Sequence, residues 1–301
     1  MKLHPECSVC LVHWVFERTV PYTPERETVR LIRNIVGVLL HDVSPLANVG
    51  SLCNRTVQTV FECTPGLSRH YEDLKQKSND NAKKVLPEAI DYIKLRKTPQ
   101  SRLARACFLA AAANVAPLNA PSSPYTFQEI RDIINKPNRE MIIVGDLFGA
   151  LKSSRHVLYV TDNTGEIGFD SLVISQIKDI GPKVTLIVKS ETFFEDATMD
   201  DVHAFGLEKL VDEIVTVPGF LTPHEMDPSV ARSFELSDLV IAKGTGSYEA
   251  LHGEIVDKKA AYMLKVKCKP IARELGIEEG NIIVKVEQKR LRGYQSTERR
   301  Y

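Results

Sequence analysis

The 301-residue sequence has no long apolar run and no excess of charge of either sign. No stretch approaches the roughly 18 to 20 apolar residues that span a bilayer, and the opening MKLHPECSVCLVHW carries charge where a signal peptide is uniformly apolar. The 39 basic and 39 acidic residues cancel, which removes the positive field typical of nucleic-acid or anionic-membrane binders. We therefore expect a cytoplasmic protein that binds neither nucleic acid nor membrane.

Cysteine is also scarce, because six scattered residues cannot form the disulfide framework of a secreted scaffold of this length. We expect reduced thiols, and only Cys7 and Cys10 are close enough in sequence to share a site. The chain has no internal repeat or low-complexity segment. With 43% hydrophobic and 26% charged residues it has the composition of a globular protein with a sizeable core. Its length fits one or two domains.

The first 135 residues have a helical pattern. Segments such as Glu25 to Leu40 and Ser101 to Ala113 carry apolar residues at steps of three and four. The stretch from Pro117 to Pro124 concentrates Pro, Ser and Asn, which is typical of a connection. We therefore predict a helical region over 1–135. A basic, aperiodic tail is expected over 288–301.

From Met141 the pattern changes to short β-rich runs separated by helical segments, which indicates a parallel sheet with crossover helices. We predict an α/β domain over 136–287, with a Rossmann-like three-layer α/β/α fold and a mainly parallel sheet. Ligands of such folds bind beyond the carboxyl ends of the strands. The predicted strands are MIIV at 141, VLYV at 157, VTLIV at 184, EIVTV at 213, LVIA at 239 and IIVKV at 282.

Polar residues follow the second predicted strand at once, where the chain reads Asp162-Asn163-Thr164-Gly165-Glu166. Carboxylate and amide oxygens are the ligands that hard divalent cations prefer. The alternative interpretation is an ordinary βα turn with a helix cap, because the same residue types favour turns.

Two further loops favour a site over a simple turn. The third predicted strand leads to Asp196, and neighbouring parallel strands end at the same edge of a sheet. The run after LVIA contains Lys243, Gly244, Gly246 and Ser247, and glycines at a helix N-terminus let backbone N–H groups face an anion. Three polar loops at one edge therefore predict a metal and phosphate site.

These residues resemble the signatures of the damage-control phosphatases, a family formerly grouped under a domain of unknown function. Asp162-Asn163-x-Gly165-Glu166 with Asp170 is similar to the family's D-N-x-G-E-x-x-x-D pattern. Asp196-Ala197-Thr198 resembles its Asp-Ala/Val-Thr block. The segment from Lys243 to Glu249 resembles its K-G-x-G-N-Y-E block, with Ser247 where Asn is common. Leu264 to Ala272 and the N-terminal C-x-x-C are similar to the small prokaryotic and archaeal branch.

The resemblance implies a metal-dependent phosphatase that hydrolyses monoesters of small phosphorylated metabolites, such as sugar phosphates or damaged nucleotides. It implies metal ligation by Asp162, Asn163 and Asp196, with Mn²⁺, Ni²⁺, Co²⁺ or Mg²⁺ as the ion. Asp162 and Glu166 are the expected catalytic residues, Glu166 orienting water or a ligand. The expected phosphate or substrate side comprises Lys267, Lys243, Gly244, Gly246, Ser247 and Asn114.

Several alternatives remain open at the level of sequence. Asp162 in such a position also fits a covalent nucleophile. Cys7 and Cys10 fit a second metal or a redox pair, or simple packing, and residues at steps of three on a helix do not all face one ion. Competing functions are an S-adenosylmethionine-dependent carboxyl methyltransferase, which would need a glycine-rich loop after the first strand, and a non-catalytic metal- or nucleotide-binding protein.

Overall fold

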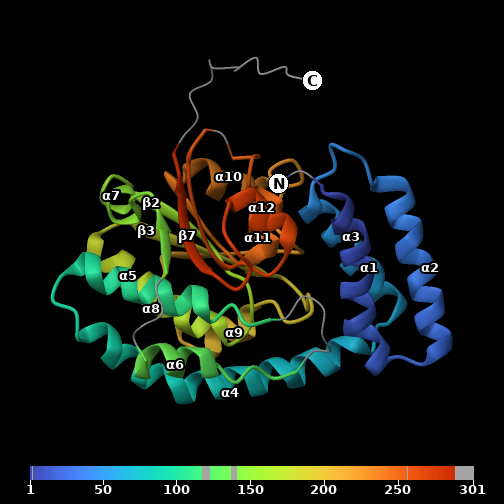
Figure 1. Ribbon diagram of the computed structural model, residues 1–301, viewed down its shortest axis with the longest axis horizontal. Helices are drawn as coiled ribbons and strands as arrows, with labels where there is room; N and C mark the ends of the chain where they lie inside the picture. Colours follow the sequence, from blue (N-terminus) through green and yellow to red (C-terminus); the bar gives the residue numbers. More distant parts are fainter. Residues whose placement is uncertain (2, 117–122, 137–140, 256, 289–301) are drawn as a thin grey trace.

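A seven-stranded sheet forms the centre of the computed structural model, which describes residues 1, 3–116, 123–136, 141–255 and 257–288 (Figure 1). The strand order is β1-β7-β6-β5-β2-β3-β4, and every neighbouring pair is parallel except β6 and β7. The strands are β1 (Ile142–Val144), β2 (His156–Val160), β3 (Lys183–Lys189), β4 (Glu213–Val217), β5 (Leu239–Lys243), β6 (Lys259–Lys265) and β7 (Ile282–Glu287).

All six predicted strands are present, and the predicted mainly parallel α/β fold is confirmed. The prediction missed β6, because its sequence KAAYMLK has no β-branched residue and begins and ends with lysine. Strand β6 lies between β5 and β7, so it brings the segment that follows it, including Lys267, to the same part of the molecule as the β5 loop.

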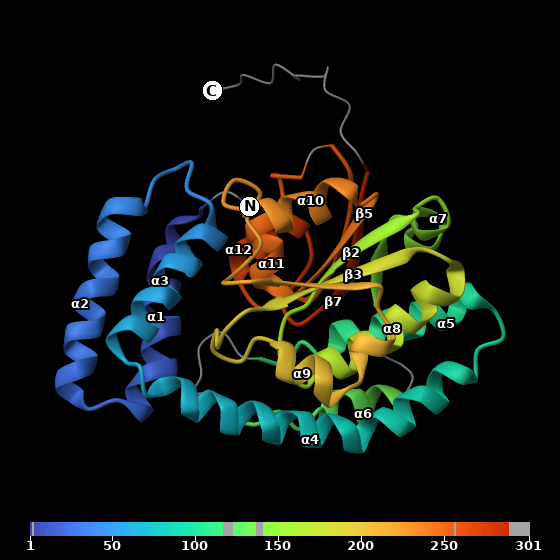
Figure 2. The ribbon, with the colours of Figure 1, turned by 180° about the vertical axis from the view of Figure 1, so that it is seen from behind.

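Helices cover both faces of this sheet, and Figures 1 and 2 show them from opposite sides. In the view of Figure 1, the N-terminal helices α1–α3 lie to one side of the sheet and the long helix α4 runs below it. The helices are α1 (Pro5–Thr19), α2 (Glu25–Asp42), α3 (Val49–Cys63), α4 (Leu67–Lys94), α5 (Pro99–Ala112), α6 (Gln128–Asn135), α7 (Leu147–Lys152), α8 (Glu166–Ile180), α9 (Met199–Ala204), α10 (Pro228–Leu236), α11 (Gly244–Leu251) and α12 (Lys269–Leu275), with short 3₁₀ turns η1 (Val20–Tyr22) and η2 (Leu207–Lys209).

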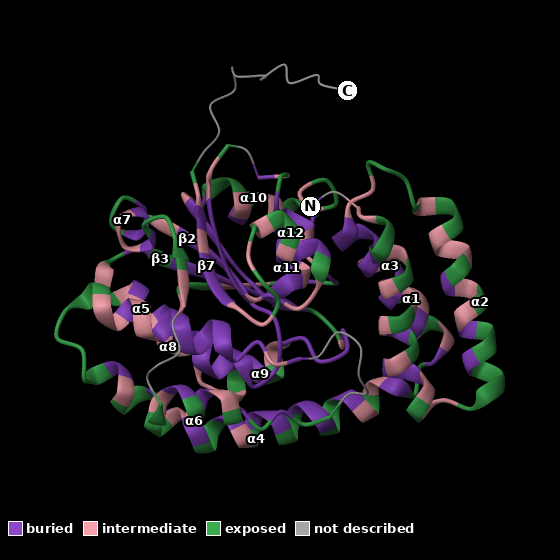
Figure 3. Cartoon of the chain, viewed as in Figure 1, coloured by how far each residue is buried: buried purple, intermediate pink, exposed green. Residues whose placement is uncertain are grey.

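Two hydrophobic cores lie on the two faces of the sheet, and Figure 3 shows most of the central strands as buried. Successive side chains of β2 alternate between them: Val157 and Tyr159 join the core under α5 and α8, and Leu158 and Val160 join the core under α11. This alternation is what a strand buried on both faces requires. A third cluster packs α1, α2 and α3 against Phe193 and Phe194.

The predicted boundary at residue 136 falls between the first six helices and β1. Leu109 of α5 and Val85 of α4 nevertheless share a core with Tyr159 and Ile241 of the sheet. Helices from the first 135 residues therefore form part of the layer that covers one sheet face, and the division into two domains stays a prediction. Of the predicted connection 117–124 and tail 288–301, residues 117–122 and 289–301 lie outside the described residues.

The topology fixes where a ligand can bind. From β2 the chain proceeds to β3 and β4 on one side, whereas β5 and β6 lie on the other. The point between β2 and β5 is thus a topological switch point, where loops leave in opposite directions and open a crevice. None of the described helices has the length and apolar character needed to cross a membrane.

Candidate active site

The loops after β2 and β3 are bound to each other directly at this switch point. The Ala197 N–H donates to the Asp162 carbonyl at 2.8 Å, and the Thr164 N–H donates to the Glu195 carbonyl at 2.8 Å. Asn163 and Asp196 form an isolated antiparallel bridge. The structure therefore places the three predicted metal ligands in two short segments that face one another.

A buried network surrounds the Asp162 carboxylate. Its Oδ2 accepts hydrogen bonds from Asn114 Nδ2 and, at 2.8 Å, from Asn163 Nδ2. Both amides also donate to Oε2 of Glu166, each at 2.9 Å. Neither Asn114 nor Glu166 lines the adjacent cavity. Their hydrogen bonds therefore hold the side chains of Asp162 and Asn163 in place from the side away from the cavity.

Gly244, the first residue of α11, presses against the same carboxylate. Its φ is +77°, and a Cβ atom built there would lie 1.9 Å from Oδ2 of Asp162. Glycine is required here for both the backbone conformation and the space. Gly246 and Thr245 follow and line the cavity, close to the start of the helix, where backbone N–H groups have no partner within the helix.

Burial dominates the electrostatics of this site. Burial raises the pKa of Asp162 to about 8, helped by the Glu166 and Asp196 carboxylates and opposed by Lys267 and Lys243. Burial also raises the pKa of Asp196, although the Lys189 ammonium lies 3.0 Å from its Oδ2. Two carboxyl groups of raised pKa face one crevice, and a cation between them would offset the cost of ionising both.

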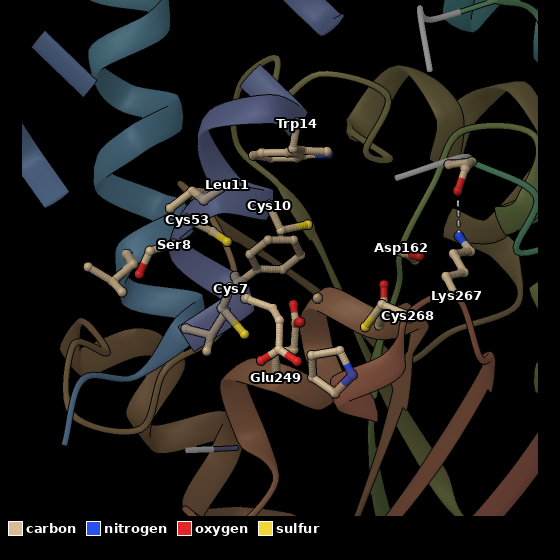
Figure 4. A pocket seen from close by; sticks show the side chains of 18 of the residues that line it. Cys7, Ser8, Cys10, Leu11, Trp14, Cys53, Asp162, Glu249, Lys267 and Cys268 are labelled. Carbon is tan, nitrogen blue, oxygen red and sulfur yellow. Dashed lines mark hydrogen bonds between the residues drawn. The ribbon is translucent and has the colours of Figure 1, made fainter. Parts of the chain in front are cut away.

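Lys267 contributes positive charge to this crevice from the segment after β6. Its ammonium donates to the Ala116 carbonyl at 2.7 Å, and Lys267 and Asp162 both line the same cavity (Figure 4). Burial lowers the pKa of Lys267, and the neighbouring Asp162 and Glu166 carboxylates raise it in part. This position agrees with the predicted phosphate side of the site.

Lys243 occupies a different place from the one that the sequence led us to expect. Its side chain is fully buried, and its ammonium lies 2.5 Å from Glu166 and 2.8 Å from Asp170. It also donates to the Ala110 carbonyl at 2.9 Å. These two buried carboxylates hold the Lys243 ammonium away from the cavity, and Lys243 is not among the residues that line it. The structure therefore gives Lys243 no direct contact with a phosphate bound in the cavity.

The cavity beside Asp162 has a volume of about 340 Å³ and lies between α1, α3 and the sheet loops (Figure 4). Of the residues expected on the substrate side, Lys267 and Gly246 line it. Ser247 is buried, and its hydroxyl has no hydrogen-bond partner among the described residues. Asn114, Lys243, Gly244 and Ser247 therefore stand behind the cavity wall and support the residues that form it.

Sequence reasoning missed Arg18, which lines the same cavity from α1. Its Nε lies 3.1 Å from Oε2 of Glu195, and both side chains are buried. A buried acidic residue requires a cationic partner, but the sequence around Glu195 does not show that this partner comes from α1.

A second group that the sequence did not reveal fixes the two segments that carry the predicted metal ligands. Asp201 Oδ1 accepts hydrogen bonds from Thr164 at 2.6 Å and from Asn79 at 2.7 Å. Its Oδ2 accepts one from the Thr198 N–H at 2.7 Å and lies 2.9 Å from the Lys75 ammonium. Helix α4 and Asp201, in the first turn of α9, thus connect both segments.

Cys7 and Cys10 also line the cavity, as free thiols. Burial raises the pKa of Cys7, and burial raises the pKa of Cys10 to about 11, so neither is a reactive thiolate near neutral pH. Among the described residues no group of three or more His, Cys, Asp and Glu is arranged to hold a metal. A metal or redox role of the pair stays a prediction.

The residues at the switch point fit a divalent cation. Asp162, Asp196 and Asn163 offer two carboxylates and an amide, the donors that hard cations take, and a small number of protein ligands suffices when a phosphate completes the shell. The buried Asn114 Oδ1 beside them has no hydrogen-bond partner among the described residues. Asp162, Asn163 and Asp196, with Asn114 beside them, therefore provide oxygen atoms whose capacity to accept hydrogen bonds or bind a cation is not filled by protein atoms.

Residues 3–283 match the family described as Damage-control phosphatase ARMT1-like domain. A damage-control phosphatase of Pyrococcus horikoshii is 33% identical, over 94% of this chain and 97% of its own. One from Archaeoglobus fulgidus is 27% identical, over 95% and 99%, and an uncharacterized protein of Methanocaldococcus jannaschii is 29% identical, over 95% and 96%.

The fold also has a solved counterpart. The crystal structure of a DUF89-family protein from Pyrococcus horikoshii superposes with a TM-score of 0.73 at 24% identity, covering 94% of this chain and 98% of that one. The family match extends over nearly the whole sequence and includes every strand-end loop described above. The chain therefore belongs to the ARMT1-like damage-control phosphatase family.

Proposed function

We propose that this protein is a metal-dependent phosphatase that hydrolyses phosphate monoesters of small metabolites. The observation that carries the proposal is the convergence of Asp162, Asn163 and Asp196 opposite Lys267 at the switch point of the sheet. This chain belongs to a phosphatase family, and two of its relatives are named damage-control phosphatases, which supports the same reaction.

Phosphate esters resist hydrolysis because the attacking oxygen approaches anionic oxygens, so a catalyst must neutralise charge and align the reactants. Asp162, Asn163 and Asp196 would hold a divalent cation, which would supply Lewis acidity and lower the pKa of bound water. The candidate ions are Mn²⁺, Ni²⁺, Co²⁺ and Mg²⁺, and of these Mg²⁺ and Mn²⁺ are the ones that oxygen ligands favour.

The protein groups have distinct tasks in this proposal. Lys267 binds a phosphoryl oxygen from the opposite side, and the N–H groups at the start of α11 bind another. Asp162 lines the cavity and is the proposed catalytic residue as well as a metal ligand. Glu166 acts as a positioning residue, because its carboxylate accepts hydrogen bonds from Asn163 and Asn114 and does not line the cavity.

The direct test is phosphate release from a panel of phosphate monoesters with Mg²⁺, Mn²⁺, Co²⁺ or Ni²⁺ added. Asp162→Ala and Asp196→Ala are expected to lose activity, and Asp179→Ala, an exposed change on α8, is the matched control that retains it. Wild-type protein that releases no phosphate with any ion would contradict the proposal.

The two rival functions give different results in the same experiment. A non-catalytic binding protein would take up metal without turnover. A methyltransferase would bind S-adenosylmethionine, yet β1 lies at the sheet edge and is followed only by Gly145 and Asp146 in place of a glycine-rich loop.

A further inference from the structure

Glu249 is a carboxylate in the cavity wall to which the phosphatase reaction assigns no task. It lies on α11, one turn after Gly246, and its side chain lines the cavity. Among the described residues its carboxylate takes part in no hydrogen bond or salt bridge, although its backbone carbonyl accepts one from the Met1 amino group. Glu249 is half-buried, and a carboxylate that loses water without gaining a partner is costly, which favours a role in binding.

Three cysteine thiols lie within electrostatic range of Glu249. Cys7 of α1, Cys53 of α3 and Cys268 at the start of α12 line the same cavity. Burial raises the pKa of each of these thiols above its ordinary value, so all three are uncharged near neutral pH. Burial likewise raises the pKa of Glu249 to about 7, and the Met1 amino group opposes this rise.

The cavity consequently has two chemically different sides. In Figure 4 Asp162 and Lys267 lie toward one side, and Glu249 lies toward the other, near Cys7. The cavity volume of about 340 Å³ is at the lower end of the sizes typical of small-molecule sites, roughly 300 to 1,000 Å³. A ligand with its phosphate beside Lys267 would therefore extend its organic part toward Glu249.

We propose that Glu249 is a specificity-determining residue that selects phosphate monoesters whose organic part carries a hydrogen-bond donor, either a hydroxyl or an ammonium group. This inference rests on the phosphatase function proposed above. A donor would provide the partner that the carboxylate lacks, and a hydrogen bond to a charged group is worth on the order of ten- to a hundredfold in binding. An ester with only a methyl end would leave Glu249 desolvated and unpaired.

Matched substrates test the inference directly. Linear alkyl phosphates of two to six carbons would be compared in three series that end in methyl, hydroxyl or ammonium. With metal-loaded wild-type protein we expect kcat/KM to be about tenfold or more higher for a donor-ended ester than for the methyl-ended ester of equal length. Glu249→Met keeps the side-chain length and removes the acceptor, so this preference should disappear or reverse.

Two further variants keep the result interpretable. Glu249→Gln retains the shape and an acceptor oxygen, so it should reduce the preference for ammonium more than the preference for hydroxyl. Glu278→Met makes the same change at an exposed residue outside the cavity and should leave all three series unaffected. Thermal unfolding of each variant identifies any that fails to fold.

The outcomes separate this inference from the proposed function. A wild-type protein that hydrolyses no ester contradicts the phosphatase proposal itself. A wild-type protein that hydrolyses the three series equally, or a folded Glu249→Met variant that keeps the donor preference, overturns the role of Glu249 and leaves the phosphatase proposal standing. Loss of only the ammonium preference in Glu249→Gln identifies a cationic partner, and loss of both in Glu249→Met supports donors in general.

Discussion

The Lys75 ammonium lies 2.9 Å from Oδ2 of Asp201, and both side chains are buried. Lys75 belongs to α4 and Asp201 to α9, so this ion pair connects two helices that are 126 residues apart in the chain (201 − 75). Asp201 also binds Thr164, which follows Asn163, and the backbone of Thr198, two residues after Asp196. The pair therefore determines how the loops after β2 and β3 face each other.

Replacing Asp201 by Asn should weaken this connection. We expect the free energy of unfolding to fall by roughly 3 kcal/mol, because removing one partner leaves the buried Lys75 charge uncompensated. The apparent metal affinity should fall as well, since both segments lose a common support. Chemical denaturation and metal titration of the activity measure the two effects.

Asp212 provides the control for that prediction. Its ion pair with Lys178 at 2.6 Å is about one-third exposed on both sides, so Asp212→Asn should cost at most about 1 kcal/mol. Metal affinity should not change. Equal losses in the two variants would argue against such a connection at Asp201.

Gly244→Ala should inactivate the protein by displacing Asp162. The added Cβ would come within 1.9 Å of Asp162 Oδ2, at a backbone φ of +77°. A shift of this order at a reacting group can cost about a hundredfold in rate, and we expect at least that loss in phosphate release.

Gly253→Ala separates backbone strain from this collision. Gly253 also has a positive φ, +84°, but a Cβ there would meet no atom within 4 Å. We expect a loss of about 1 kcal/mol in stability with activity retained. If both variants were equally active, the close approach of Gly244 to Asp162 would not matter for function.

Lys243→Met tests whether this lysine has an internal role. The change leaves Glu166 and Asp170 without the ammonium that both contact, so we expect a loss of roughly 3 to 5 kcal/mol in stability. Lys267→Met should instead abolish activity with little loss of stability, because burial already lowers the pKa of Lys267. A stable Lys243→Met variant with a raised KM would restore the phosphate role that we first expected.

Glu249 should make stability decrease with pH. Its pKa is about 7 in the folded protein, against 4.5 ordinarily, so the folded state holds more protons than the unfolded chain between these values. The free energy of unfolding then falls as pH rises through this window, by at most about 3 kcal/mol. The neighbouring thiols do not titrate there, because their pKa values are raised from 9. Glu249→Gln should be less dependent on pH over the same range, as measured by thermal unfolding.

Much of the site could be predicted because the loops that follow neighbouring parallel strands lie at the same edge of a sheet. β2 (HVLYV) and β3 (KVTLIVK) carry runs of apolar and β-branched residues that indicate buried parallel strands, and parallel neighbours end at one edge. Asp162 and Asp196 therefore had to converge once the two strands paired. The same logic failed for Lys243, since it gives the position of a residue along the strand but not the direction of its long side chain.

Other parts of the site depend on contacts between distant segments. Arg18 and Glu195 are 177 residues apart, and neither has local features that reveal the other. Strand β6 lacks β-branched residues, and it forms because β5 and β7 pair with it on both sides. Tertiary pairing overrides weak local propensity in this case.

The cavity also has a consequence for synthesis of the protein. Its wall combines Cys7 and Arg18 of α1 with Lys267 and Cys268 near α12, so it requires segments from nearly the two ends of the described chain. A ribosome-bound nascent chain cannot assemble this wall until α12 has left the exit tunnel, even if the earlier helices have already folded. The cavity would therefore be complete only after the segment through α12 has been synthesised.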